Sequence, residues 1–151
     1  MEKLTFNILI DASPERVWDI LLGETTYPAW TSVFAEGSSV QTDWQEGSKA
    51  LFLDGKGNGM VSRIAKNIPN EYLSIEHLGS FKDGIEDTES ESVKEWAGAL
   101  ENYTLKPSDG KTELFIDMDS SDDFKDYLLK TWPPALEKVK ELAEKQEHAV
   151  L

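Results

Sequence analysis

The segment from residue 122 to residue 143 constrains the fold of this chain more than any other. Its large apolar residues recur every three or four positions, which is the spacing of one face of a helix. These residues are Phe124, Leu128, Trp132, Ala135, Leu136, Val139, Leu142 and Ala143. A proline inside a helix is costly, so Pro133-Pro134 predict a short helix over 122–130 and a long one that begins near Thr131, with both prolines in its first turn.

The start of the chain predicts one strand and two short helices. Apolar and polar residues alternate over 4–10, which is typical of a strand with one apolar face. Ser13-Pro14 is a good helix start, and the apolar residues of 17–22 predict a short helix behind it. The aromatic segment 27–30 predicts a second short helical turn.

The middle of the chain reads as strands joined by tight turns. The predicted strands are 35–42, 48–54, 59–67, 71–79, 99–106 and 111–119. Strands joined by tight turns are antiparallel, and a sheet with one apolar face must bury that face. Only the C-terminal helix is long enough to cover it. We therefore expect a single α+β domain over 1–151, with an antiparallel sheet of about seven strands and two short helices after the first strand.

Four segments carry a resemblance to a known superfamily. They are Phe6-x-Ile8-x-Ile10-x-Ala12-Ser13-Pro14-Glu15-Arg16-Val17-Trp18, Tyr27-Pro28-Ala29-Trp30, the Trp96–Leu105 strand and the Trp132–Lys140 helix. Together they resemble the START and Bet-v-1-like (SRPBCC) superfamily, in its bacterial branch of homologues of the activator of heat-shock-protein ATPase. The resemblance implies a helix-grip fold, in which the sheet curls round the long helix and leaves a cavity. It also implies an apolar or amphipathic small ligand there, since some relatives carry lipids, some assist chaperones in stress responses, and some are cyclases or hydrolases.

Pairing across the predicted turns places one set of side chains on a common face of the sheet. We expect Lys106 opposite Lys111, Leu73 opposite Leu105, and Ile64 opposite Leu73. The shared face then carries Met60, Ile64, Leu73, Ile75, His77, Glu101, Tyr103, Leu114, Ile116 and Met118. This face is apolar apart from one histidine and one glutamate.

The pairing predicts that His77 lies opposite Glu101, and two interpretations of the pair stay open. The two side chains can anchor a ligand or work as an acid–base pair, which requires that they lie within about 6 Å of each other. Alternatively, they satisfy one another and only fix the register of the sheet. We therefore assign no catalytic residue and keep these two as candidates.

Aromatic residues also have two interpretations. Trp30, Phe34, Phe52, Trp96 and Trp132 can line the mouth of the cavity or belong to the core. Trp96 and Trp132 are the stronger candidates, because the resemblance places the cavity beside them. The candidate ligand-binding residues are Trp30, Phe52, Met60, Ile64, Ile75, His77, Trp96, Glu101, Tyr103, Ile116, Leu128 and Trp132.

Charge and composition exclude several classes of function. The chain has 15 Lys and Arg residues against 29 Asp and Glu residues, a formal net charge of −14, so it repels nucleic acids and anionic membrane surfaces. It has no cysteine, no apolar run of the ~20 residues that a membrane helix needs, and no signal peptide, so we expect a cytoplasmic location. With only His77 and His148, a histidine-rich metal site is excluded, and we expect no metal or cofactor.

The segment 82–95 is acidic and reads as a long polar loop, which can be a lid, a partner site or an insertion. Taken together, the sequence favours binding of a small apolar or amphipathic molecule without covalent chemistry, in a monomer or homodimer. One alternative is a protein-interaction module that assists a chaperone. The other is an enzyme of cyclase or hydrolase type that uses His77 and Glu101.

Overall fold

The structure, a computed structural model, describes the backbone of residues 1–149 and the side chains of residues 1–145, so the side chain of His148 lies outside the described part. The elements are β1 (Glu2–Ile10), α1 (Pro14–Leu22), α2 (Thr26–Thr31), β2 (Ser39–Gln41), β3 (Lys49–Leu53), β4 (Gly59–Ile68), β5 (Tyr72–Lys82), β6 (Ile85–Asp87), α3 (Glu91–Lys94), β7 (Ala99–Ser108), β8 (Lys111–Ser120) and α4 (Asp122–Ala149). Their order and types confirm the α+β helix-grip fold.

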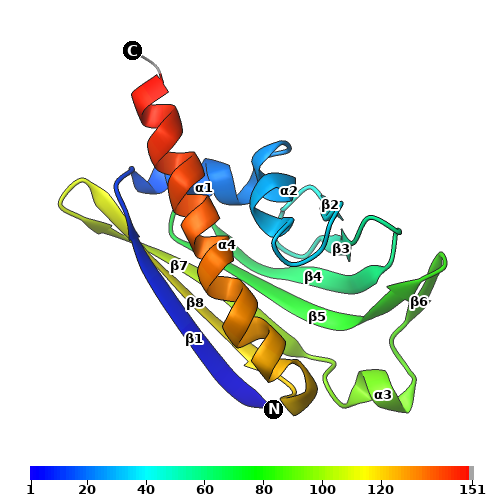
Figure 1. Cartoon of the computed structure of the whole chain (residues 1–151). Coiled ribbons are helices and arrows are strands. Elements are labelled where there is room, and N and C mark those ends of the chain that lie inside the picture. Colours follow the sequence, from blue (N-terminus) through cyan, green and yellow to red (C-terminus); the bar gives the residue numbers. More distant parts are fainter. Residues whose placement is uncertain (150–151) are drawn as a thin grey trace.

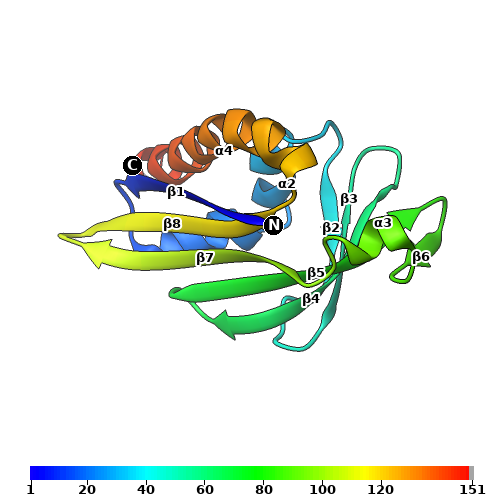
Figure 2. The same cartoon turned by 90° about the horizontal axis from the view of Figure 1, so that it is seen from below.

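One antiparallel sheet of eight strands forms the larger layer. Its strand order is β1-β8-β7-β5-β4-β3-β2, and β6 pairs with β5 outside this path. The sheet curves, and α4 lies on its concave side along β1 (Figures 1 and 2). The helices α1 and α2 also pack against α4, so α4 is held from two sides.

Local sequence signals account for the two short helices. The Ser13 side chain accepts a hydrogen bond from the backbone N–H of Arg16 at 3.2 Å, and Pro14 occupies the first turn of α1. The helix α1 ends before Gly23, as expected, and buries Trp18 in the core. The aromatic segment 27–30 lies within α2.

The C-terminal helix differs from its prediction. Residues Asp122–Ala149 form one continuous helix with Pro133 and Pro134 inside it, instead of two helices that divide near Thr131. Both prolines are exposed, so water can hydrate the two carbonyls of the preceding turn that lose their N–H partners. One turn earlier on the same helix, the Thr131 hydroxyl donates to the backbone carbonyl of Tyr127 at 2.6 Å.

The predicted strand registers are displaced by two residues between β5 and β7 and between β7 and β8, and by two or three residues between β4 and β5. Lys106 lies opposite Glu113 instead of Lys111, because the hairpin turn holds only Asp109 and Gly110, at φ 53° and 82°. Leu73 pairs with Tyr103 instead of Leu105, and His77 pairs with Ala99 instead of Glu101. Ile64 pairs with Ile75, and β4 contains two register irregularities. A displacement of two keeps the side chains of β5, β7 and β8 on their predicted face, because side chains alternate with a period of two.

The acidic segment 82–95 is folded, which corrects the expectation of a loop. Asp83 and Gly84 make a tight turn with positive φ between β5 and β6, and Ser90 begins the one-turn helix α3. Val93 of α3 is 3% exposed and anchors this extension, which lies at the lower right of Figure 1.

Candidate functional site

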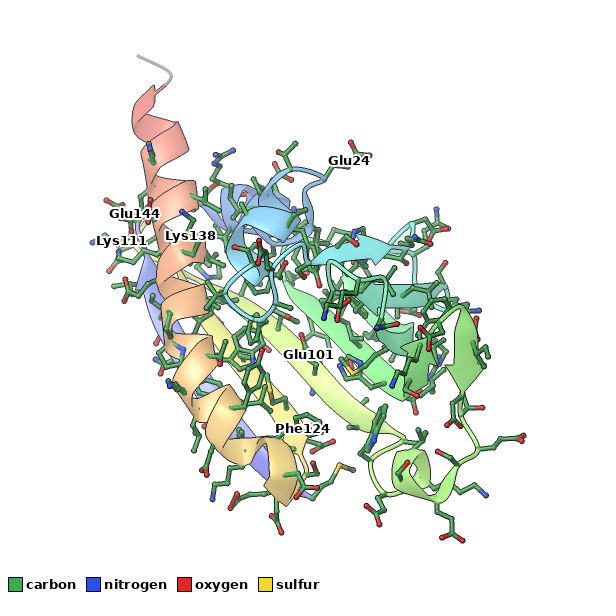
Figure 3. The ribbon with its side chains drawn as sticks, turned by 45° about the vertical axis from the view of Figure 1, so that its right-hand side comes forward. Glu24, Glu101, Lys111, Phe124, Lys138 and Glu144 are labelled. Carbon is green, nitrogen blue, oxygen red and sulfur yellow. The ribbon has the colours of Figure 1, made fainter. Side chains whose placement is uncertain are left out.

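A cavity of about 620 Å³ lies between the concave face of the sheet and the helices α2 and α4. Side chains from β3, β4, β5, β7 and β8 form its floor. Aromatic residues dominate the wall: Tyr27, Trp30, Phe34, Phe52, Trp96, Tyr103, Phe124, Tyr127 and Trp132. Figure 3 shows Glu101 in the space between the sheet and α4, and Phe124 near the N-terminal end of that helix.

The structure brings nine of the twelve candidate ligand-binding residues to this wall. They are Trp30, Phe52, Met60, His77, Trp96, Glu101, Tyr103, Leu128 and Trp132. The other three, Ile64, Ile75 and Ile116, are no more than 2% exposed and belong to the packed core. They share a sheet face with His77 and Glu101, but they lie where other side chains cover that face.

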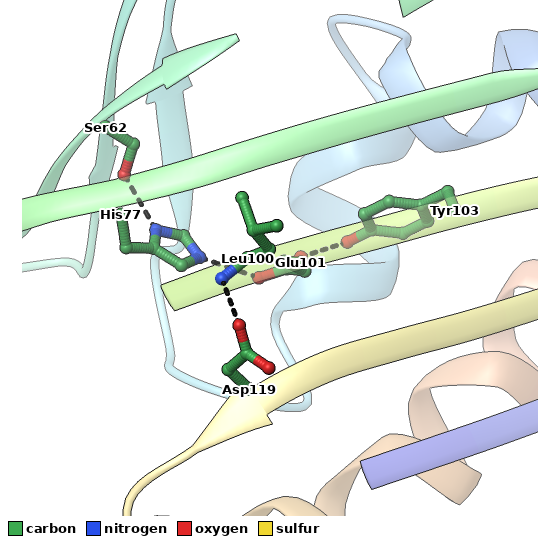
Figure 4. Close-up of polar contacts among 6 residues, drawn as sticks. All are labelled: Ser62, His77, Leu100, Glu101, Tyr103 and Asp119. Carbon is green, nitrogen blue, oxygen red and sulfur yellow. Dashed lines mark hydrogen bonds and ion pairs between the residues drawn. The ribbon is translucent and has the colours of Figure 1, made fainter. Parts of the chain in front are cut away.

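Four polar side chains at the cavity, Ser62, His77, Glu101 and Tyr103, form one chain of hydrogen bonds (Figure 4). The Ser62 hydroxyl lies 2.7 Å from Nδ1 of His77, and Nε2 of His77 lies 3.0 Å from Oε1 of Glu101. The Tyr103 hydroxyl donates to the other carboxylate oxygen, Oε2. Since a carboxylate only accepts, Nε2 of His77 carries the proton of its hydrogen bond to Glu101.

Burial opposes ionisation of the Glu101 carboxyl, but the hydrogen bond and charge of His77, with the hydrogen bond from Tyr103, outweigh it and lower the pKa of Glu101. The side chain of Glu101 keeps 21% of its surface exposed, so its charge is not sealed in protein. Burial and the charge of Glu101 raise the pKa of Tyr103 and of Tyr27, so both phenols keep their protons at neutral pH.

Trp132 stands between the cavity and the packed part of the core. Its ring centroid lies 4.9 Å from that of Phe34, 6.0 Å from Trp30 and 6.1 Å from Tyr103. On its other side it stacks on Phe6 at 6.0 Å. Such aromatic contacts each stabilise the fold by about 0.5–1.5 kcal/mol beyond the contribution of the buried area. They therefore fix the position of Trp132 at the boundary of the cavity.

A family model matches residues 11–144, a span that runs from the start of α1 into α4 and includes the whole polar chain of the cavity. The chain belongs to the family of Activator of Hsp90 ATPase homolog 1-like (AHSA1) proteins. This confirms the branch to which its motifs pointed. No curated protein matches this AHSA1 chain in sequence.

Solved structures share the fold of this AHSA1 chain. A protein from Mesorhizobium loti is 15% identical, with a TM-score of 0.74 over 95% of this chain and 98% of its own. The Aha1 dimer from Colwellia psychrerythraea, solved in solution, is 19% identical, with a TM-score of 0.72 over 95% and 97%. A protein from Cytophaga hutchinsonii is 17% identical, with a TM-score of 0.71 over 98% and 97%. At these identities the likeness shows the fold alone.

Sequence reasoning missed several residues of the AHSA1 cavity wall and Ser62, the buried partner of His77. Ser62 lies between Met60 and Ile64 in the alternating pattern that selected both, so that pattern already contained it. Tyr127 follows Phe124 at helical spacing, and its hydroxyl donates to the backbone carbonyl of Phe34. No sequence signal distinguished Asp54 and Asp119, which reach the rim from the ends of their strands.

Among residues with described side chains, no group of three or more histidines and carboxylates is arranged to hold a metal ion. No helix in the described part of the chain is long and apolar enough to cross a membrane.

Proposed function

We propose that this chain binds a small apolar or amphipathic molecule in the cavity between the sheet and α4, without covalent chemistry. One observation carries the proposal: a cavity of about 620 Å³ has many aromatic residues in its wall and a hydrogen-bonded polar cluster at Glu101. Small-molecule sites commonly have volumes of roughly 300–1,000 Å³, apolar walls and a few converging polar groups. The expected cytoplasmic location belongs to this proposal.

Neighbouring residues of α4 offer a matched test. Leu128 lines the cavity, whereas Leu129 is 44% exposed on the outside of the same turn. A Leu128→Trp variant adds an indole to the cavity, and Leu129→Trp adds the same group to the surface. We expect native mass spectrometry of protein purified from its own host, or incubated with host extract, to show a small-molecule adduct on the wild type and on Leu129→Trp, but not on Leu128→Trp.

The same samples give a second measure. A molecule that binds only the folded protein raises its melting temperature, so the extract should stabilise the wild type and Leu129→Trp more than Leu128→Trp. A bare wild-type chain, with no adduct and no thermal shift after incubation, would contradict the proposal.

An acid–base enzyme is the second candidate, because the His77–Glu101 distance of 3.0 Å meets the geometric condition for proton transfer. In this function Glu101, an ionised carboxylate that opens into the cavity, acts as the base, and His77 holds it in place. Host extract incubated with the wild type and with Glu101→Gln distinguishes this function from simple binding. A metabolite consumed only by the wild type supports an enzyme, and an unchanged extract argues against one.

A protein-interaction module is the third candidate, and it rests on the rim of the cavity. Phe124 and Tyr127 are 55% and 45% exposed there, which is unusual for adjacent aromatic side chains on one helix face. The family description names an activator of the Hsp90 ATPase, and the Colwellia relative is a dimer, so a chaperone or a second copy of this chain are the partners to test. A Phe124→Ser/Tyr127→Ser variant that binds a chaperone or dimerises as well as the wild type would remove this candidate.

A further inference from the structure

The charged side chains of the cavity wall are mainly acidic. Three carboxylates line it, from Asp54, Glu101 and Asp119, whereas no lysine or arginine side chain does so among the residues whose side chains the structure describes. Asp54 accepts hydrogen bonds from the backbone N–H groups of Lys56 and Asn58, and Asp119 accepts one from Leu100. These two carboxylates are therefore fixed at the rim, and Glu101 is the charge inside.

His77 is the one basic side chain in the described wall, and its ring nitrogens are not available to hydrogen-bond an anion. Its Nδ1 is engaged by Ser62 and its Nε2 by Glu101, so both ring nitrogens already have partners. The N-terminus of α4 also lies near the rim, and a helix N-terminus attracts anions. However, its first turn contains Asp122 and Asp123, which oppose that attraction.

Glu101 keeps capacity for a further donor. A carboxylate has about four acceptor positions, and the hydrogen bonds from His77 and Tyr103 use one on each oxygen. Its remaining exposed surface opens into the cavity. A ligand group that donates hydrogen bonds can complete this site, whereas a second carboxylate would meet a like charge in a poorly solvated space.

Aromatic rings surround the same position. Tyr103 bonds to Glu101 directly, Trp132 lies 6.1 Å from Tyr103 between ring centroids, and Phe52 lies 6.0 Å from the His77 ring. Aromatic faces attract cations within about 6 Å, most strongly where water is excluded. A carboxylate among aromatic rings is thus suited to an ammonium group attached to an apolar body.

We propose that the ligand of this cavity is an amphipathic amine, bound with its ammonium group at Glu101 and its apolar body among the aromatic side chains, and that fatty acids and other carboxylates are disfavoured. This inference rests on the proposed binding function and names its ligand class. It also assigns the His77–Glu101 pair a role in ligand binding besides fixing the register of the sheet: His77 and Tyr103 keep the Glu101 carboxylate ionised and oriented toward the ligand.

Three probes with one apolar body test the inference: 1-naphthylmethylamine, 1-naphthylmethanol and 1-naphthoate. Their binding is followed by quenching of tryptophan fluorescence near pH 7 in about 150 mM salt, which screens the general charge of the protein. We expect the amine to bind at least about tenfold more tightly than the carboxylate, which corresponds to about 1.4 kcal/mol, with the alcohol between them. Glu101→Gln should reduce the affinity for the amine to about that for the alcohol.

A matched control separates the cavity from the surface charge. Glu137→Gln removes the same charge from an exposed position on α4 and should leave the preference for the amine unchanged. Circular dichroism verifies that Glu101→Gln is folded. If it is not, the comparison of the three probes on the wild type still tests the inference. Carboxylate binding as tight as amine binding, or an amine preference that survives in Glu101→Gln, overturns the inference and leaves the binding function intact. If none of the three probes binds, the inference fails as well, whereas the binding function is decided by the adduct and the thermal shift of the wild type in host extract.

Discussion

The two halves of α4 meet the rest of the molecule in opposite ways. From Ala135 onward the helix is closely packed: Ala135, Val139 and Ala143 are completely buried, on the side where α4 lies against β1 and α1. Before Trp132 the helix lines the cavity, and Phe124 and Tyr127 are about half exposed. We call these parts the packed half and the cavity half of α4.

Side-chain size explains the difference. Two alanines in the packed half let the helix backbone approach its neighbours closely, so that the space fills at the density of a protein core. At the boundary, Trp132, Trp30 and Phe34 contact one another and occupy the space with large rings. One helix thus supplies stability along one half and leaves room for a ligand along the other, which is consistent with binding sites lying in the less stable parts of folds.

The largest expected effect compares two leucines of α4. Leu136 in the packed half is 3% exposed, so Leu136→Ala should lower the free energy of unfolding by about 2–5 kcal/mol. Leu128 is half-buried and lines the cavity, so Leu128→Ala creates little new empty volume. It should lower the free energy of unfolding by only about 1 kcal/mol. Urea unfolding of both variants measures the difference. Equal losses would mean that the two halves are packed alike.

The next effect concerns the support of the polar cluster. Ser62 is fully buried, and its hydroxyl is the partner of Nδ1 of His77 at 2.7 Å. Ser62→Ala leaves that nitrogen without its partner, so we expect a loss of about 1–3 kcal/mol in urea unfolding. Ser62→Thr keeps the hydroxyl and serves as the control. A neutral Ser62→Ala with a destabilised Ser62→Thr would show that the site needs a small side chain and not the hydrogen bond.

A smaller effect depends on pH. The folded protein lowers the pKa of Glu101, so ionisation of Glu101 stabilises the fold. This contribution is fully present above the pKa of an unfolded glutamate, about 4.3, and is lost as the pH falls through the lower pKa of the folded state. The stability difference between the wild type and Glu101→Gln should therefore shrink as the pH falls below about 4.3. A difference that grows on acidification would show that burial, and not His77 and Tyr103, determines this pKa.

The sequence was sufficient for the order of the larger strands and helices and for the sheet face of the candidate side chains, because both follow from periodicity. It was insufficient for the lengths of the turns. A two-residue turn at Asp109-Gly110 and a four-residue turn over 107–110 place the same side chains on the same face, so the pattern cannot distinguish them. His77 and Glu101 contact each other despite the displaced register, because diagonal neighbours on one face are within reach of long side chains.

The alternation of apolar and polar residues could not predict which side chains of one sheet face are buried in the core and which open into the cavity. Ile75 pairs with Glu101 and shares its face, yet Ile75 is buried in the core and Glu101 opens into the cavity. What separates them is the placement of the helices over the sheet, and alternation along a strand carries no information about that. The continuous path of α4 through Pro133 and Pro134 escaped prediction for a related reason, because only their exposure makes the prolines tolerable.

The smallest expected effect is at the rim of the cavity half. Phe124 is 55% exposed, so Phe124→Ala removes little buried surface and should change the free energy of unfolding by no more than about 0.5 kcal/mol. Phe6→Ala is the matched change at a phenylalanine that packs against the core and stacks on Trp132. We expect this variant to lose several times more free energy of unfolding than Phe124→Ala. Thermal unfolding of the two variants measures both. If Phe124→Ala destabilised the protein as much as Phe6→Ala, the rim would be part of the stabilising core, and the exposed aromatic side chains would need no ligand or partner to explain them.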